Sequence, residues 1–173
     1  MKRWIYIFSI SMVLQFIHLN ASAQQLVNVY LNQKGKASYR VAIDNIYVVI
    51  SDSGKLTEIK TDAYGTIVYN SDKRVNQIGN IRIGFNYQGF VNLIGNTQIR
   101  YDYNGRTDRL GNLELRYNYN GLLVTIGGQQ IVYNTDNSID QIGLHRITYN
   151  YNKQVQKIDD SKGLIVLQLN YDK

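Results

Sequence analysis

A sixteen-residue unit that repeats without gaps is the strongest constraint on how this chain can fold. Five consecutive units run from Ser71 to Asn150, and each has the same pattern of turn residues and apolar positions. Two looser copies flank them, at 51–70 and 151–173. A fixed short period predicts a series of identical small elements, because one such unit is too small to bury its own apolar side chains.

Each unit contains two turn signals. An Asn-Gly pair such as Asn104-Gly105 occupies positions two and three, and it predicts a type I′ hairpin turn. A glycine at position nine, such as Gly111, can open a type II′ turn. The segments between the turns have about five and seven residues, which are strand lengths and too short to propagate a helix. The unit is therefore predicted to be a β-hairpin.

The apolar residues are spaced differently in the two segments of the unit. The longer segment alternates, with Leu113, Leu115 and Tyr117 on one face and polar residues on the other. In the shorter segment the apolar positions five and eight are an odd number apart, so a regular strand would place them on opposite faces. We favour a bulge or a three-residue turn beside the Asn-Gly pair, because either would bring both positions into the core.

These patterns predict an all-β protein whose residues 51–173 form an antiparallel β-hairpin repeat meander, with two strands per unit, curled or folded on itself. A parallel β-helix is the rival arrangement. Residues 24–50 follow the repeat less closely. We expect them to form two or three strands, turned at 32–36 and at Asp44-Asn45, that cap one end of the meander within the same domain.

The N-terminal residues have the three parts of a secretory signal peptide: the basic Lys2 and Arg3, an apolar run of about fourteen residues, and Ala21-Ser22-Ala23. The apolar run is shorter than the roughly 20 residues that a membrane-spanning helix needs. We expect residues 1–23 to be removed, leaving a secreted or periplasmic protein with no integral membrane span.

The charge and the cysteine content of the chain narrow the class of protein further. The net charge is +6, from 19 basic and 13 acidic residues, and it falls to about +4 without Lys2 and Arg3. These charges are dispersed along the chain, which argues against a nucleic-acid partner. The chain has no cysteine, so burial and strand pairing must hold the fold without disulfides.

The segments IRYDYNGRTDRL (99–110) and LRYNYNGLLVTI (115–126) resemble the YD repeat, also called the RHS repeat. The present unit is shorter than the family's usual repeat, and Asn mostly replaces Asp. The resemblance covers 51–173. It implies a ribbon of antiparallel hairpins, of a kind often found in large secreted shells, toxin carriers or adhesion proteins. The residues that match the family's motif in kind are Arg100, Tyr101, Asp102, Tyr103, Gly105 and Arg106.

Residues suited to catalysis or metal binding are scarce after the signal peptide. His145 follows a turn and is expected to be solvated, and Asp159-Asp160 are adjacent residues expected in a loop. The polar residues of 134–140 alternate like the start of a calcium loop, but they lack its central glycine and closing glutamate. A polar hairpin turn explains them better. We therefore expect no enzyme, no cofactor and no metal.

Tyrosine is the most distinctive residue of the repeat. Ten of the 15 tyrosines occupy position fifteen or position one of a unit. They share a face with Ile and Leu, so we expect core packing, with a recognition strip for sugars or peptides as the alternative. The ten are Tyr69, Tyr87, Tyr101, Tyr103, Tyr117, Tyr119, Tyr133, Tyr149, Tyr151 and Tyr171.

Three arginines on the opposite face are candidate binding residues. Arg100 and Arg116 lie one unit apart, and Arg109 lies on the strand between them. Together they could bind an anionic glycan or a protein. Solvated charge that protects the sheet from aggregation is the other interpretation.

The function expected from these observations is a non-enzymatic binding or structural module at the cell envelope, with a glycan or protein of the envelope or extracellular space as partner. One alternative is an enzyme or inhibitor whose pocket is formed by the N-terminal segment and lined by Lys36, Arg40 and Asp44. The other alternative is a self-associating matrix component.

Overall fold

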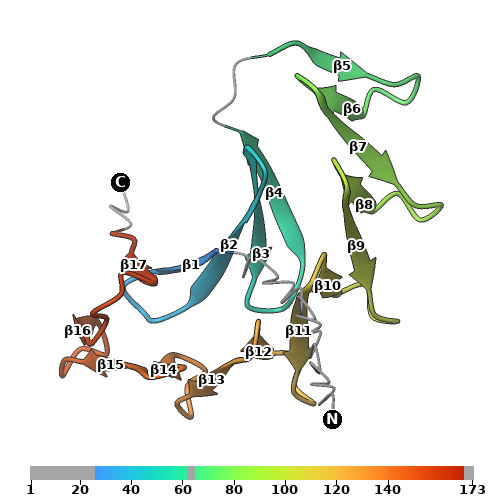
Figure 1. The fold of residues 1–173 in the computed structure, drawn as a ribbon. Helices are drawn as coiled ribbons and strands as arrows, with labels where there is room; N and C mark the ends of the chain where they lie inside the picture. Colours follow the sequence, from blue (N-terminus) through green and yellow to red (C-terminus); the bar gives the residue numbers. More distant parts are fainter. Residues whose placement is uncertain (1–25, 62–64, 170–173) are drawn as a thin grey trace, which may run out of the picture.

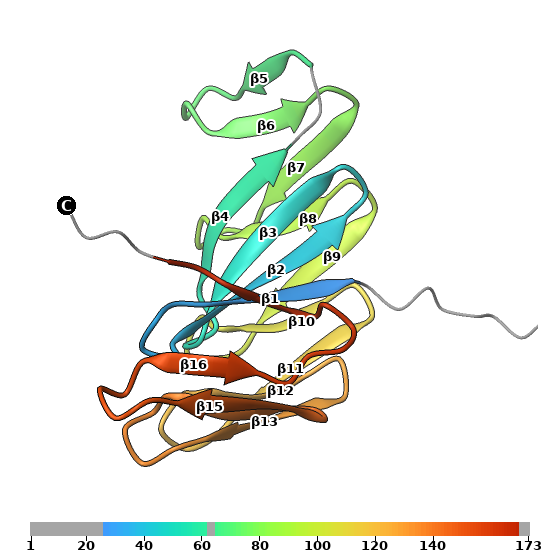
Figure 2. The ribbon, with the colours of Figure 1, turned by 90° about the vertical axis from the view of Figure 1, so that its left-hand side faces the viewer.

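The computed structural model describes residues 26–61 and 65–169, and all regular structure in these ranges is β-strand. The strands form two sheets (Figures 1 and 2). One is a twelve-stranded antiparallel sheet in strict sequence order from β5 to β16, here called the meander. The other, here called the inner sheet, has five strands in the order β17-β1-β2-β3-β4. The predicted signal peptide, residues 1–23, lies outside the described ranges.

The strand bounds show two strands in each unit of the repeat, as predicted. The meander consists of β5 (Ile67–Tyr69), β6 (Val75–Ile78), β7 (Ile81–Phe85), β8 (Val91–Ile94), β9 (Thr97–Tyr101), β10 (Thr107–Leu110), β11 (Leu113–Tyr117), β12 (Leu123–Ile126), β13 (Gln129–Tyr133), β14 (Ile139–Ile142), β15 (His145–Tyr149) and β16 (Val155–Ile158). The inner sheet consists of β1 (Val27–Leu31), β2 (Ala37–Ile43), β3 (Ile46–Ser51), β4 (Leu56–Thr61) and β17 (Ile165–Leu167). The antiparallel pairing confirms the meander and excludes the parallel β-helix.

The meander curls into an open arc, and the inner sheet lies in its concavity (Figure 1). β5 and β16 stand at the two ends of the arc and do not meet, so the sheet does not close into a barrel. The core lies between the two sheets. It contains alternate residues of β2 and β3, which are fully buried, together with the concave-face residues of β8 to β15.

The structure corrects the predicted extent of the meander and the place of the N-terminal strands. β4 and β17 were expected to continue the meander, but β4 pairs with β3, and β17 pairs in parallel with β1. β1, β2 and β3 have their turns where expected, yet they line the concavity instead of capping β5 or β16. Covering a wide apolar face removes more apolar surface from water than covering one edge strand would.

The Asn-Gly turn is a three-residue turn, so the prediction of type I′ was wrong. In the loop at 102–106, the N–H of Asp102 donates to the carbonyl of Arg106 (2.8 Å), and the N–H of Gly105 donates to the carbonyl of Asp102 (3.0 Å). Gly105 has a φ of +74°, whereas Asn104 is not among the residues with positive φ. Asp102 Oδ1 also accepts the N–H groups of Asn104 and Arg106, which explains why Asp or Asn recurs at position sixteen.

A bulge follows each of these turns and resolves the odd spacing of positions five and eight. Thr107 lies opposite Tyr101, and the register then shifts between Thr107 and Arg109. Thr107 and Leu110, at positions five and eight, are therefore both fully buried. A bulge and a three-residue turn were predicted as alternatives, and the structure has both. The two-residue turn at position nine is also confirmed by the pairing of Leu110 with Leu113.

Replacing Lys153 with glycine should raise the free energy of unfolding by about 1 kcal/mol, as measured by urea denaturation. Lys153 occupies the turn position held by Gly105 in another unit, and it has a φ of +58°, which strains a residue that carries a Cβ. Its contact with Asp136 spans 3.6 Å between exposed groups, so its loss should matter little. Lys157→Gly, within β16, is the control and should be destabilising. A Lys153→Gly variant no more stable than wild type would contradict the prediction.

Candidate functional site

Four tyrosines at position fifteen are structural. The rings of Tyr101, Tyr117, Tyr133 and Tyr149 are half-buried against the core, whereas Tyr69 in β5 is 59% exposed. Tyr101 and Tyr133 donate their hydroxyl groups to the carbonyls of Val91 and Leu123, each at 2.7 Å, and Tyr117 does the same to Thr107. Burial raises the pKa of Tyr101 and of Tyr133 to about 12. The prediction of core packing is confirmed for these four residues and is wrong for Tyr69.

Four bulges of the meander are bonded to two loops of the inner sheet, at 32–36 and 51–55. Thr107 and Leu123 donate their N–H groups to the carbonyls of Gly54 (2.8 Å) and Asp52 (2.9 Å). Ile139 and Val155 donate in the same way to the first of the two loops, at 3.0 and 2.8 Å. These bonds satisfy backbone groups that a bulge removes from the strand ladder. They hold the concave face of the meander on the inner sheet.

These two loops have the same construction as the loops of the meander. Asn32 Oδ1 accepts the N–H groups of Lys34 and Lys36, and Gly35 completes the turn with a φ of +70°. The inner sheet is thus built from longer copies of the same hairpin, which the sequence analysis missed. The signal that could have found it is a polar side chain three residues before a glycine, as in Asn32 to Gly35 and again in Ser51 to Gly54.

The tyrosines at position one have a different environment, and the expectation that they share the core face was wrong. Each lies at the start of a hairpin loop and is fully exposed. The exposed fractions are 96% for Tyr87, 95% for Tyr103, 104% for Tyr119 and 100% for Tyr151. We call these four residues the tyrosine rim. Tyr171, from the same predicted set, lies outside the described residues.

The tyrosine rim follows one edge of the meander, where the longer hairpin loops project (Figure 2, left-hand edge). Adjacent loops are two strands apart, which corresponds to about 10 Å. An exposed amide side chain follows each tyrosine, and these amides are Gln88, Asn104, Asn120 and Asn152. Within 26–61 and 65–169, none of these four tyrosine and four amide side chains has a hydrogen bond to the protein. Their polar groups are free to bind a ligand.

A hollow of about 450 Å³ lies behind the rim between two neighbouring loops. Phe90 forms part of its wall, and its ring centroid is 5.1 Å from that of Tyr101. Lys55 of the inner sheet and Asn104 of the rim add polar groups. The hollow therefore combines an aromatic surface with one cation and one amide, beside two exposed tyrosines.

The three predicted arginines lie together on the convex face, but each has an acidic partner. Arg100 bonds to Asp108 at 3.0 Å, and this hydrogen bond raises the pKa of Arg100. Arg109 and Arg116 both contact Glu114, at 2.5 and 3.3 Å. Two carboxylates thus neutralise most of the charge of the three arginines. The cluster resembles a cross-strand network more than an open anion site.

The residues of the predicted N-terminal pocket do not come together. Lys36 and Asp44 flank opposite ends of β2. Lys36 donates to the carbonyls of Asp136 (3.2 Å) and Asn137 (2.8 Å) in the meander, which makes it a docking residue. Arg40 lies 3.6 Å from the centroid of the Tyr47 ring. This arrangement gives no support to a pocket lined by the three.

His145 is buried, so the prediction that it is solvated was wrong. Its Nδ1 lies 3.2 Å from the Asp159 carbonyl and 3.3 Å from Asp160 Oδ1. Burial alone would raise the pKa of Asp160, but hydrogen bonds from the backbone N–H groups of Ile165, Leu164 and Lys162 outweigh it and lower that pKa. Asp160 thus stabilises the loop before β17, and His145 packs beneath it. The positions of His145 and Asp160 are therefore explained by their role in holding this loop.

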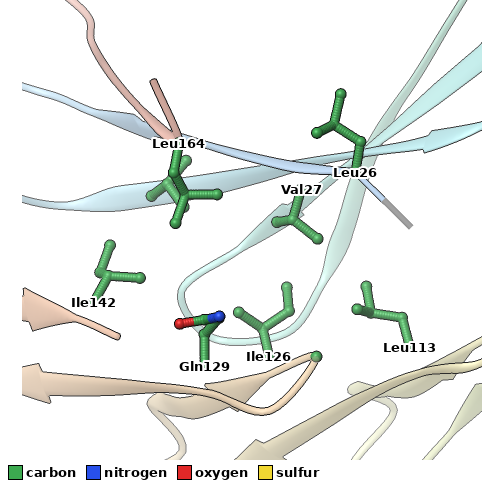
Figure 3. A pocket seen from close by; sticks show the side chains of 9 residues that line it. Leu26, Val27, Leu113, Ile126, Gln129, Ile142 and Leu164 are labelled. Carbon is green, nitrogen blue, oxygen red and sulfur yellow. The ribbon is translucent and has the colours of Figure 1, made fainter. Parts of the chain in front are cut away.

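An apolar hollow of about 200 Å³ lies beside this loop, between β1 and the two-residue turns of the meander (Figure 3). Leu26, Val27 and Leu164 face Leu113, Ile126 and Ile142 across it. Gln129 is the one polar side chain among the residues labelled there. A hollow with so few polar groups has little means of orienting a ligand.

Residues 134–138 form a hairpin turn, as predicted, and β14 begins at Ile139. Asp136 Oδ1 accepts the N–H and hydroxyl groups of Ser138. In the described part of the chain, no three side chains of His, Asp or Glu converge as metal ligands would. No helix there is long and apolar enough to cross a membrane. Comparisons with protein-family models, curated proteins and solved structures find no match. The resemblance to the YD repeat stays a prediction.

Proposed function

We propose that the protein is a non-enzymatic binding module of the cell envelope, secreted or periplasmic, and that the tyrosine rim is its ligand-binding surface. The observation that carries the proposal is the near-complete exposure of a tyrosine at the same position of four hairpin loops. The fold does not require these rings, because Ser71 and Thr135 occupy the same position in two other units. A role in binding a ligand, and not in stabilising the fold, explains why tyrosine occurs at this position.

An extended glycan is the ligand that fits this surface best. A tyrosine ring offers a flat apolar face and a hydroxyl, so it can stack on the C–H face of a sugar while bonding to its polar edge. The neighbouring amides both donate and accept hydrogen bonds, as sugar hydroxyls require. Tyr87, Tyr103 and Tyr119 lie on successive loops about 10 Å apart, a constant spacing that suits a linear polymer, and Tyr151 follows after the loop that carries Thr135. The exposed rings and amides carry no charge, so the proposed ligand is neutral.

Glycan binding can be tested with a double variant, Tyr103→Ser with Tyr119→Ser, which installs the residue found naturally at Ser71. We expect the wild type to bind one or more neutral linear polysaccharides in a pull-down and on a glycan array. The double variant should bind at least about tenfold more weakly, because it loses two stacking contacts. Its unfolding midpoint should not change, since both rings are fully exposed.

The matched control is Arg100→Ala with Arg116→Ala, which removes two exposed cations from the convex face without touching the rim. This variant should bind neutral glycan as the wild type does. Binding that depends on these arginines and not on the tyrosines would overturn the proposal in favour of the convex face. Failure of the wild type to bind any polysaccharide tested would also overturn it.

A further inference from the structure

Among the described residues, β5 and β16 have no paired strand on one side, and each lacks a different strand of the hairpin unit. In each complete unit, the second strand pairs with the first strand across the two-residue turn, as in β6 and β7, where Ile78 lies opposite Ile81. β5 is a second strand whose own first strand, β4, belongs to the inner sheet. β16 is a first strand whose own successor, β17, has left to pair with β1. β5 therefore needs a first strand, and β16 needs a second.

We propose that copies of this chain assemble head to tail, with β5 of one copy pairing antiparallel with β16 of the next. The pairing would continue the meander from one molecule into another. Within one molecule it cannot occur, because β5 and β16 lie at opposite ends of the arc (Figure 1).

The backbone N–H and C=O groups of β5 have the orientation that this pairing requires. The Gly79 N–H donates to the Thr66 carbonyl on the β6 side. Because backbone groups alternate between the two sides of a strand, those of Ile67 point to the open side. In complete units, position eight lies opposite position eleven. The same register across two copies would place Gly65 opposite Ile158.

The backbone of β16 is complementary to that of β5. The Asp159 N–H donates to the Arg146 carbonyl of β15, so the backbone groups of Ile158 point away from β15. In complete units the ladder on this side contains two pairs, position seven with twelve and position eight with eleven. The same pairs across two copies would be Lys157 with Thr66 and Ile158 with Gly65. Both edges therefore present free donors and acceptors in matching register.

Apolar side chains are exposed at both of these ends. In β5, Ile67 is 47% and Tyr69 is 59% exposed, whereas Ile83, at the position of Ile67 in the next unit, is 3% exposed. At the other end, Val166 and Leu167 of β17 are 39% and 36% exposed. β17 lies beside β16 on its concave side (Figure 1). A β5 strand docked on β16 would bring its Ile67 face against these β17 residues.

Because the two edges differ, the contact is heterologous, and repeating it links many molecules in an open chain or a ring. The rim loops of successive copies would then lie along one continuous edge. This inference does not depend on the proposed glycan, since it rests on the two strand edges alone.

Proline substitutions test the assembly, because each removes a donor from one open edge without removing a bond of the existing ladder. Ile67→Pro blocks β5 and leaves β16 available, and Ile158→Pro does the reverse. We expect the purified wild-type protein to form species larger than a dimer as its concentration rises, as measured by sedimentation velocity. Each variant alone should be monomeric, and an equimolar mixture should give a heterodimer and nothing larger.

The mixture also controls for folding, since two misfolded variants would not form a defined heterodimer. A wild type that stays monomeric at all concentrations would overturn the proposal. So would a single variant that still forms long species, or a mixture that stays monomeric. The variant Tyr103→Ser with Tyr119→Ser should assemble as the wild type does, so loss of glycan binding and loss of assembly are separable results.

Discussion

Replacing Gly54 with alanine is expected to lower the free energy of unfolding by about 3 to 5 kcal/mol. Gly54 has a φ of +81°, and a Cβ built on it would overlap the ring of Tyr117. Its carbonyl also accepts the N–H of Thr107, one of the bonds that dock the inner sheet on the meander. The variant must therefore accept backbone strain and also displace a half-buried ring. Chemical denaturation of both proteins measures the difference.

Gly128→Ala separates these two effects. Gly128 has nearly the same φ, +80°, but a Cβ there would meet no atom within 4 Å. We expect this control to cost about 1 to 2 kcal/mol, which is the cost of the left-handed conformation alone. Equal losses for Gly54→Ala and Gly128→Ala would show that the contact between the two sheets contributes little.

Replacing Tyr117 with alanine should cost about 3 kcal/mol, as for other large aromatic truncations in cores. The change removes the ring that packs on Gly54 and the hydroxyl that bonds to the Thr107 carbonyl. It also removes a cation–π contact, since the Arg106 guanidinium lies 4.6 Å from the ring centroid. Tyr117→Phe keeps the ring and should lose only about 1 kcal/mol, from the hydrogen bond.

Tyr119→Ala is the matched control, because it removes the same side chain two residues away at a fully exposed position. Its unfolding free energy should stay within about 0.5 kcal/mol of wild type. If Tyr119→Ala proved as costly as Tyr117→Ala, the division of the tyrosines into core and rim would be wrong. The combination of Gly54→Ala with Tyr117→Ala should cost less than the two changes summed, because truncating the ring relieves the overlap.

The hairpin unit could be predicted from the sequence because its determinants are local. Alternation within Leu113–Tyr117 defines a face, and the glycines at positions three and nine fix where the strands turn. The odd spacing of positions five and eight even pointed to the bulge that the register at Thr107 shows. Each of these signals spans a few residues, and none depends on a partner elsewhere in the chain.

The arrangement of the two sheets could not be predicted in the same way. Leu56 and Ile59 have the spacing of a meander strand, but a strand of the inner sheet has the same spacing. The sequence of β4 therefore does not show which of the two sheets it joins. The position-one tyrosines were misassigned because alternation was counted past the end of the strand. After Asp102 the chain enters a loop, so Tyr103 no longer follows the alternation set by Tyr101.

The parallel pairing of β1 with β17 has a consequence for how the chain reaches this structure. Val29 lies opposite Ile165, so the first and last strands meet across 136 positions of sequence. The hairpins between them can form from local contacts, but this contact requires a very long loop to close, and such closures slow folding. Until it forms, the apolar strand β1 has one unpaired edge. The inner sheet is therefore complete only after the last strand has been synthesised, although its first three hairpin strands are the first to emerge.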